Sequence, residues 1–269
     1  MRTEDVFQLT AEQKAVVELP VAARVLVTAG PGTGKTHTMT ARIYHLVSEQ
    51  NVAAGSEILV LTFTRAAVRE IRKRCRGVGG RLDYVLASTF DSFASRLLRK
   101  FQPEALQEAT SYDARIQAAT TLIETNDEAR TWLSRYKHIF VDEIQDLVGV
   151  RSSFVKVMLH HSNAGFSLFG DPAQSIYNFQ LTGLDREIGS KELLQWLVAH
   201  FPDLVTQKLT VNHRAQSNLA RSALHFGQKL NDERVSHDHV YTSLVSMLDT
   251  YEVSVSWEKL GHAIRSVVG

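Results

Sequence analysis

Short apolar runs alternate with longer amphipathic stretches along most of the 269-residue chain. The apolar runs predict strands at about 24–29, 58–63, 84–88, 138–142, 166–170 and 206–211. The amphipathic stretches predict helices at about 11–18, 35–49, 65–76, 91–101, 113–124, 151–160, 190–200 and 214–230. This alternation is typical of an α/β fold in which helices cover both faces of a parallel sheet. Because such sheets bind ligands beyond the carboxyl ends of their strands, the residues that follow each strand are the functional candidates.

The segment after the first predicted strand is rich in glycine. It reads Ala29-Gly30-Pro31-Gly32-Thr33-Gly34-Lys35-Thr36 and leads into a predicted helix. Glycines let backbone N–H groups converge on an anion, and the start of a helix adds positive charge. We expect Lys35 to neutralise the β- and γ-phosphates of a nucleotide and the Thr36 hydroxyl to bind Mg²⁺. Ala29 replaces the first glycine of the usual pattern, but the later glycines are intact.

Two adjacent acids, Asp142 and Glu143, follow the apolar run 138–141. Unpaired carboxylates are costly to bury, so this pair suits a position beside a metal and a phosphate. We expect Asp142 to hold Mg²⁺ and Glu143 to activate a water molecule. Alone, the string could mark an ordinary strand end. Together with the glycine-rich loop it predicts a nucleotide hydrolase.

Several strings occur in a fixed order over roughly residues 9–223. They are Leu9–Gln13, Ile58–Ala67, Ser88–Ala94, Asp142–Asp146, Leu168–Phe179 and Val211–Arg214. In this order they resemble the Q motif, motif Ia, the next DNA-contacting motif, motif II in its DExQD form, motif III and motif IV of the UvrD/Rep/PcrA family of superfamily 1 DNA helicases. The resemblance implies a RecA-like P-loop NTPase fold, ATP and Mg²⁺ as cofactors, and single-stranded DNA as a partner.

The resemblance also implies roles at the nucleotide. Gln13 would bind adenine and Arg42 would stack on it, although a solvated glutamine and a surface salt bridge are the ordinary alternatives. His213 stands where the family has a stacking tyrosine, Gln174 would sense the γ-phosphate, and Arg214 would be an arginine finger. The predicted ATP-binding set is Gln13, Gly30, Pro31, Gly32, Thr33, Gly34, Lys35, Thr36, Arg42 and His213. The predicted catalytic set is Lys35, Asp142, Glu143, Gln174 and Arg214, and the metal ligands are Thr36 and Asp142.

On the DNA side, the resemblance places aromatic rings against unstacked bases. Phe63 and Phe179 would stack, a contact that needs no particular base. Core packing at a strand end is the alternative for Phe63. The predicted phosphate and sugar contacts are Thr62, Thr64, Arg65, Thr89 and Tyr177. The predicted helix 65–76 carries many basic residues, which form either a DNA contact or a solvated face.

Three departures from the family pattern bear on these roles. Asp91 replaces a histidine that approaches DNA, and a carboxylate there would repel phosphate. His213 replaces the stacking tyrosine, which weakens the predicted contact with adenine. The residues after Phe179, Gln180-Leu181-Thr182-Gly183, lack the arginine that commonly follows.

Composition changes this picture little. The formal net charge of +1 gives no overall attraction to nucleic acid, so DNA must bind at a local patch. The single cysteine, Cys75, excludes an internal disulfide. The chain begins with polar residues and has no apolar run of the roughly 20 residues that span a bilayer, so we expect a cytoplasmic protein without membrane contact.

We therefore predict a RecA-like ATP-binding domain at 1–227, with a short helical insertion at about 95–137, and a helical tail at 228–269 that is an incomplete or replaced second domain. Motifs V and VI are not recognisable in the tail. The complete motor would couple Mg-ATP hydrolysis to 3′-to-5′ movement, and this chain alone would not unwind DNA without a second RecA-like domain or a partner protein. The alternative is an ATP-dependent DNA- or protein-binding switch. A nucleotide kinase fits motifs Ia and III poorly.

Overall fold

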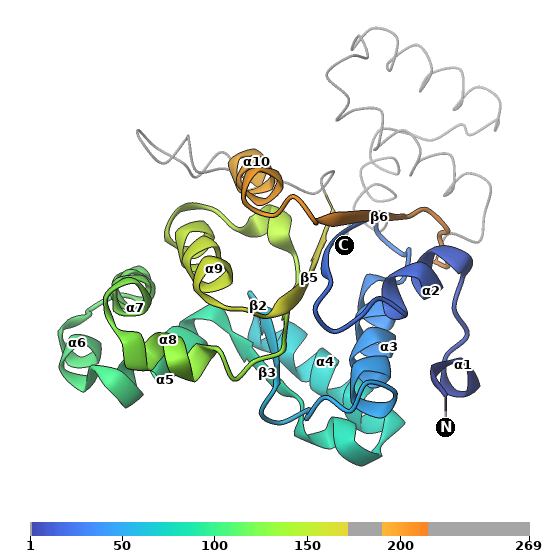
Figure 1. The fold of residues 1–269 in the computed structure, drawn as a ribbon, viewed down its shortest axis with the longest axis horizontal. Helices are drawn as coiled ribbons and strands as arrows, with labels where there is room; N and C mark the ends of the chain where they lie inside the picture. Colours follow the sequence, from blue (N-terminus) through green and yellow to red (C-terminus); the bar gives the residue numbers. More distant parts are fainter. Residues whose placement is uncertain (1, 172–189, 215–269) are drawn as a thin grey trace, which may run out of the picture. The chain divides into compact units, whose positions relative to one another are not determined.

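The chain folds around a six-stranded sheet, seen in a computed structural model that describes residues 2–171 and 190–214 (Figure 1). The strands are β1 Arg24–Ala29, β2 Ile58–Thr62, β3 Leu86–Thr89, β4 His138–Val141, β5 Gly165–Gly170 and β6 Val205–Leu209. Their spatial order is β3-β2-β4-β5-β1-β6, and every neighbouring pair is parallel. The predicted α/β class is confirmed, and each predicted strand lies within two residues of the observed one.

Seven predicted helices also lie within two residues of observed ones. These are α2 Ala11–Val17, α3 Lys35–Ser48, α4 Arg65–Val78, α5 Phe90–Phe101, α7 Tyr112–Thr125, α9 Gly149–His161 and α10 Ser190–His200. Three short helices were not predicted: α1 Thr3–Val6, α6 Pro103–Glu108 and α8 Asp127–Leu133. Two 3₁₀ turns, Gly80–Tyr84 and Ile144–Asp146, complete this part of the chain. The predicted helix 214–230 lies outside the described residues, apart from its first residue.

The sheet buries side chains on both faces, because alternate residues of each strand point in opposite directions. Leu59 and Leu61 of β2 belong to a core with α5, α7, α8, α9 and α10. Ile58 and Val60 of the same strand belong to a second core with α2, α3 and α4. Figure 1 shows α9 and α3 on opposite sides of the sheet. Burial on both faces explains why the strands read as nearly continuous apolar runs.

A buried chain of polar groups crosses the second face of the sheet. Arg42 Nε donates to Ser167 Oγ at 2.8 Å, and Ser167 Oγ lies 2.9 Å from His138 Nε2. His138 Nδ1 lies 2.7 Å from the carbonyl oxygen of Val21, which can only accept a hydrogen bond. His138 therefore carries its proton on Nδ1 and accepts from Ser167 on Nε2. The network joins α3, β4, β5 and the loop before β1.

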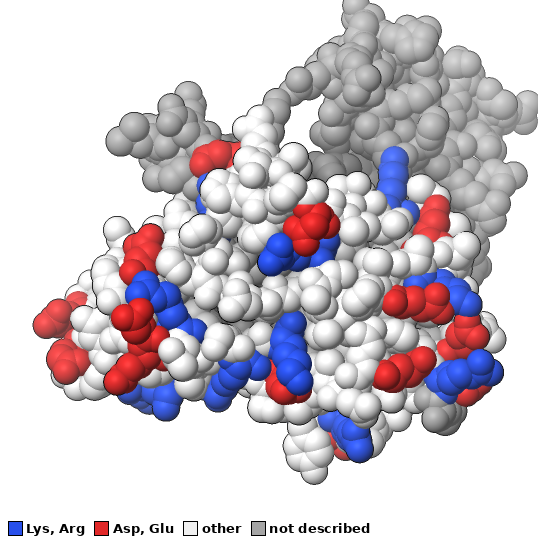
Figure 2. All heavy atoms as spheres, in the orientation of Figure 1, with Lys and Arg blue, Asp and Glu red and all other residues white. Residues whose placement is uncertain are grey.

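The chain divides into two compact units, Met1–Val211 and Asn212–Gly269. The predicted border after residue 227 lies inside the second unit. Within residues 2–171 and 190–214, no helix is long and apolar enough to cross a bilayer. On the face drawn in Figure 2, acidic and basic side chains are interspersed.

His138 predicts a pH-dependent stability. The imidazole is fully buried, and burial, with a smaller effect of Arg42, holds its pKa well below 6.5. Below pH 6.5 the unfolded chain takes up this proton and the folded chain does not, so acidification favours unfolding. The wild type should lose about 1 kcal/mol more free energy of unfolding than His138→Gln between pH 7 and 5.5.

Urea unfolding of both proteins at the two pH values measures this difference. The variant will be less stable at both pH values, but the comparison uses only the change with pH. Asp142 and Asp146, whose pKa values are raised, act in the opposite sense in both proteins and cancel. Parallel pH profiles would show that His138 takes up its proton in the folded state.

Candidate nucleotide and DNA site

The glycine-rich loop follows β1 and ends at α3. Gly32 and Gly34 have φ angles of 76° and 87°, which favour glycine over residues with a side chain. The Thr33 hydroxyl donates to the Gly30 carbonyl at 2.7 Å and closes the loop. Gly34 offers no side-chain cap to α3, so the first backbone N–H groups of the helix remain available to an anion.

The loop lysine meets the acids at the end of β4. Lys35 Nζ lies 2.7 Å from Glu143 Oε2, across 108 residues of sequence. Gln145 Nε2 donates to the same Glu143 oxygen at 2.8 Å. Asp142 accepts a hydrogen bond from the Glu143 backbone N–H at 3.1 Å and is 6% exposed. The fold thus brings together Lys35 and Glu143, which belong to separate motifs, and their roles at phosphate and water stay predictions.

The acids at this edge of the sheet carry an excess of negative charge. Burial, together with the neighbouring Glu143, raises the pKa of Asp142 from 3.8 to about 6 despite the opposing effect of Lys35. The same causes raise the pKa of Asp146 to about 6. Removing water from a carboxylate and surrounding it with like charges both disfavour its ionised form.

Two residues with oxygen atoms that can bind a metal are sequence neighbours of Lys35 and Glu143. Thr36 follows the lysine and Asp142 precedes the glutamate. Mg²⁺ prefers oxygen ligands and is commonly held by one or two carboxylates together with phosphates. A hydroxyl and a buried carboxylate next to a phosphate-binding loop therefore fit Mg²⁺ bound with a nucleotide. No set of three or more His, Cys, Asp or Glu side chains in the described part of the chain could hold a metal.

Comparison with known families agrees with this geometry. The model of the UvrD/REP helicase N-terminal domain matches residues 9–108 and 102–185, more than half of the chain. The chain belongs to the UvrD/REP helicase family. Family membership and the parallel sheet confirm the predicted RecA-like P-loop fold.

Individual relatives are similar over shorter stretches. The ATP-dependent DNA helicase UvrD2 of Mycobacterium tuberculosis is 35% identical over 147 residues, which are 52% of this chain and 20% of the relative. The ATP-dependent DNA helicase SRS2 of Saccharomyces cerevisiae is 34% identical over 100 residues, 36% of this chain and 8% of the relative. A crystal structure of Pif1 helicase from Candida albicans is 17% identical with a TM-score of 0.48, covering 87% of this chain and 46% of that one. The chain thus spans a small part of these two curated relatives.

Gln13 of this UvrD/REP-type domain lies beside the phosphate loop. Its side chain is 2% exposed, and its Nε2 donates to the Thr33 carbonyl at 3.2 Å. Its Oε1 accepts from the Thr10 backbone N–H at 3.0 Å and helps to cap α2. These contacts join α2 to the loop, and the contact of Gln13 with adenine stays a prediction.

The structure contradicts the predicted role of Arg42. The residue is fully buried, so it presents no surface to a base. Besides Ser167, its guanidinium donates at 2.9–3.2 Å to the carbonyl oxygens of Val16, Val17, Leu19 and Pro20. The physical reason lies in the helix pattern: Arg42 shares a face of α3 with the buried Met39, Ile43 and Leu46.

The predicted DNA contacts at β2 separate into buried and exposed residues. Thr62 is 1% exposed, and its hydroxyl has no hydrogen-bond partner among the residues that the structure describes, so the predicted contact of this side chain with DNA is contradicted by its burial in the strand. Phe63 is half-buried and packs edge-on against Phe90, with the ring centroids 5.2 Å apart. Thr64 is exposed and caps α4 by accepting from the Ala67 N–H, and Arg65 is exposed.

At β3, Thr89 caps α5 by accepting from the Ser92 N–H at 3.2 Å and is 7% exposed. Asp91 does not present an isolated carboxylate, because Arg151 Nη2 lies 3.1 Å from its Oδ1. Arg151 also pairs with Asp113 at 2.9 Å. The expected repulsion between Asp91 and phosphate is therefore reduced by a partner on α9 that the sequence motifs did not reveal.

The remaining predicted residues are not placed in this site. Gln174, Tyr177 and Phe179 lie outside the described residues. His213 and Arg214 are exposed residues of the second unit, where the Arg214 N–H donates to Asn212 Oδ1 at 2.8 Å. Their roles at ATP stay predictions. Conversely, Gln145 contacts Glu143, and its only sequence signal was its place in the DExQD string.

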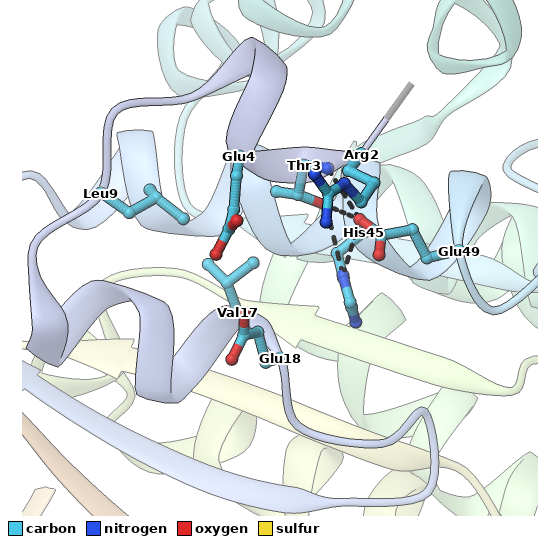
Figure 3. Close-up of a pocket in the computed structure, with 8 residues that line it drawn as sticks. All are labelled: Arg2, Thr3, Glu4, Leu9, Val17, Glu18, His45 and Glu49. Carbon is cyan, nitrogen blue, oxygen red and sulfur yellow. Dashed lines mark hydrogen bonds and ion pairs between the residues drawn. The ribbon is translucent and has the colours of Figure 1, made fainter.

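A separate pocket lies at the other end of α3 from Lys35 (Figure 3). Its lining includes Thr3, His45 and Glu49. The Thr3 N–H donates to Glu49 Oε1 at 2.7 Å, and the Thr3 hydroxyl lies 3.2 Å from His45 Nδ1. These contacts attach α1 to α3 and involve none of the predicted site residues.

Arg42→Ala is expected to destabilise the fold by at least about 3 kcal/mol, because it leaves several buried oxygens without a donor. Urea unfolding measures the loss. Affinity for Mg-ATP, measured at a temperature where the variant is folded, should change much less. A stable variant with greatly weakened nucleotide binding would restore the predicted adenine contact.

Proposed function

We propose that this chain is the ATP-binding half of a superfamily 1 DNA helicase and that it binds Mg-ATP at the edge of the sheet where Lys35 meets Glu143. The observation that carries the proposal is the 2.7 Å contact between these side chains, which lie in different motifs. A loop lysine, a helix N-terminus and buried carboxylates are the parts that phosphoryl transfer needs. The relatives named above are ATP-dependent DNA helicases, which supports the same function.

Each residue has a distinct task in this proposal. Backbone N–H groups of the loop and of the first turn of α3 bind the phosphates, and Lys35 leaves Glu143 to neutralise them. Thr36 and Asp142 hold Mg²⁺, which supplies positive charge to the phosphate oxygens when bound. Glu143, released from Lys35, accepts a proton from the attacking water. The 3′-to-5′ direction and the coupling to movement rest on the family resemblance.

The proposed DNA surface extends from the end of β2 along α4. Arg65, Arg69, Arg72 and Arg76 recur at intervals of four, three and four residues, so they share one face of the helix. All four are exposed, and none takes part in a salt bridge with another described residue. The row spans about 16 Å at 1.5 Å per residue. We call this row the arginine stripe. Arg72 also donates to the Ala87 carbonyl at 2.7 Å. A row of cations that form no salt bridge within the described part of the chain, beside the predicted stacking residue Phe63, suits a DNA backbone.

The nucleotide site is tested with Lys35→Ala. The variant should bind Mg-ATP about 10- to 100-fold more weakly, because it loses a charge-assisted contact with phosphate. Titration with a fluorescent ATP analogue measures the affinity, and circular dichroism verifies folding. Lys156→Ala is the matched control, because Lys156 is also half-buried and lies 2.8 Å from a glutamate, Glu192, outside the site. Unchanged binding by a folded Lys35→Ala protein contradicts the proposal.

The arginine stripe is tested through salt dependence. Replacing Arg65 and Arg69 by alanine should lower the slope of log K against log salt for single-stranded DNA by about 1.4, at about 0.7 for each lost phosphate contact. Arg74→Ala is the control, because Arg74 pairs with Glu70 at 2.7 Å and lies off the stripe. Equal slopes for the double variant and the wild type would show that α4 is only solvated.

The polypeptide of residues 1–269 should bind Mg-ATP but hydrolyse it slowly and should not unwind DNA. In this family a second RecA-like domain brings an arginine to the γ-phosphate, and such a residue contributes about 10³–10⁵ in rate. ATPase assays with and without single-stranded DNA, and a strand-separation assay, measure both activities. Rapid DNA-stimulated turnover that Glu143→Gln abolishes would show that these residues complete the site themselves.

A further inference from the structure

Gln145 connects the catalytic carboxylate to the end of β5. Its side chain is buried, with 5% exposed. One end of the carboxamide lies 3.0 Å from the Asp171 backbone nitrogen, which can only donate, so that end is Oε1. The other end is therefore Nε2, which donates to Glu143 Oε2 at 2.8 Å. The two contacts fix the orientation of the amide and attach Glu143 to the sheet.

The hydrogen bond from Gln145 restrains a glutamate whose backbone has an uncommon conformation. Its φ and ψ angles are 54° and 51°, in the left-handed region that a residue with a side chain seldom occupies. Two donors hold its Oε2, Lys35 and Gln145. In the proposed function Lys35 moves to the phosphates, whereas the partner of Gln145 on β5 is a backbone group that stays in place. Gln145 is then the remaining described side chain that restrains this carboxylate.

Gly170 makes the close approach of Gln145 to β5 possible. A Cβ atom at this position would lie 2.5 Å from Ile144 Cγ1 and 3.0 Å from Gln145 Oε1. The absence of a side chain therefore lets the turn Ile144–Asp146 pack against the strand. The sequence places Gly170 immediately before the backbone nitrogen that anchors the amide.

We propose that Gln145 is a positioning residue for the hydrolysis step, on the basis of the proposed function. It holds Glu143 Oε2 after Lys35 has moved to the phosphates and leaves Oε1 of Glu143 free to accept the proton of the attacking water. Gln145 contacts neither water nor phosphate itself in this scheme. Its contribution passes entirely through Glu143.

The first test is made on the ligand-free protein. Urea unfolding is measured for Gln145→Leu, Glu143→Gln and the double variant. Because the two side chains are in contact, the double variant should lose less stability than the sum of the single losses. Additive losses would overturn the proposed contact.

The second test is single-turnover ATP hydrolysis with enzyme in excess, followed over hours because this chain is expected to be slow. Gln145→Leu should keep its affinity for Mg-ATP and hydrolyse about 100-fold more slowly, the typical effect of a misplaced catalytic group. In the Glu143→Gln background the same change should have no further effect, since both residues act through one carboxylate. A double variant whose loss of rate is the product of the two single losses would overturn the proposal. So would a Gln145→Leu rate equal to that of the wild type.

Two further proteins separate this role from a structural one. Gln50→Leu is the matched control, because both ends of the Gln50 amide are likewise hydrogen-bonded, in this case to two backbone groups, the Val21 N–H at 2.7 Å and the Leu19 carbonyl at 3.1 Å. It should lose stability without losing rate. Gln145→Glu keeps the acceptor for Asp171 and puts a carboxylate oxygen in place of the donor to Glu143, so it tests the role if the leucine variant does not fold. It should be as slow as the leucine variant, and a wild-type rate would overturn the proposal.

Failure of the proposed function gives a different pattern. A wild-type chain that does not bind Mg-ATP, or a Glu143→Gln rate equal to the wild-type rate, removes the proposed function and the role of Gln145 with it. Normal binding and a slow Glu143→Gln variant, combined with a fast Gln145→Leu variant, remove the role of Gln145 alone.

Discussion

The hydrogen bonds of the buried Arg42 guanidinium hold together the elements on the second face of the sheet. Burial lowers its pKa to about 9, so it remains charged at neutral pH and must be surrounded by acceptors. The end of α2 and the following turn supply four backbone carbonyls, and Ser167 of β5 supplies a hydroxyl. One buried cation thereby satisfies the carbonyls of a helix end and fixes α2 to α3 and to the sheet.

This arrangement extends to the phosphate loop through α2. The same helix carries Gln13, whose amide donates to the Thr33 carbonyl, so the position of α2 determines one support of the loop. The loop before β1 packs directly against the start of β5, because a Cβ on Gly165 would lie 2.0 Å from the Val21 carbonyl oxygen. Since β1, β5 and β4 are neighbouring parallel strands, their carboxyl ends bring the loop, Asp171 and Asp142 to one edge.

The sequence predicted the strands and the motif residues, which follow from local residue patterns. It missed side-chain contacts that depend on how distant elements pack. The strands were found because burial on both faces makes them continuous apolar runs, and Lys35 and Glu143 were found because each belongs to a recognisable motif that follows a strand. The predicted role of Arg42 is wrong because its charge suggests a functional contact, whereas its position places it on the same face of α3 as buried apolar residues. The short helices α6 and α8 were missed because six or seven residues show too little periodicity. No motif could reveal Arg151, since its partners are set by how α9 packs.

The charges at the site explain why its two ligands should bind together. Asp142, Glu143 and Asp146 influence one another, and Lys35 is the cation that opposes them in the pKa of each aspartate. In the proposed function that lysine turns toward the phosphates, which would leave three carboxylates close together without it. A divalent cation compensates this excess and also the charge of the phosphates. The Lys35–Glu143 contact therefore offsets part of the negative charge of the site without nucleotide, and Mg²⁺ bound with ATP would take over this role when Lys35 turns to the phosphates.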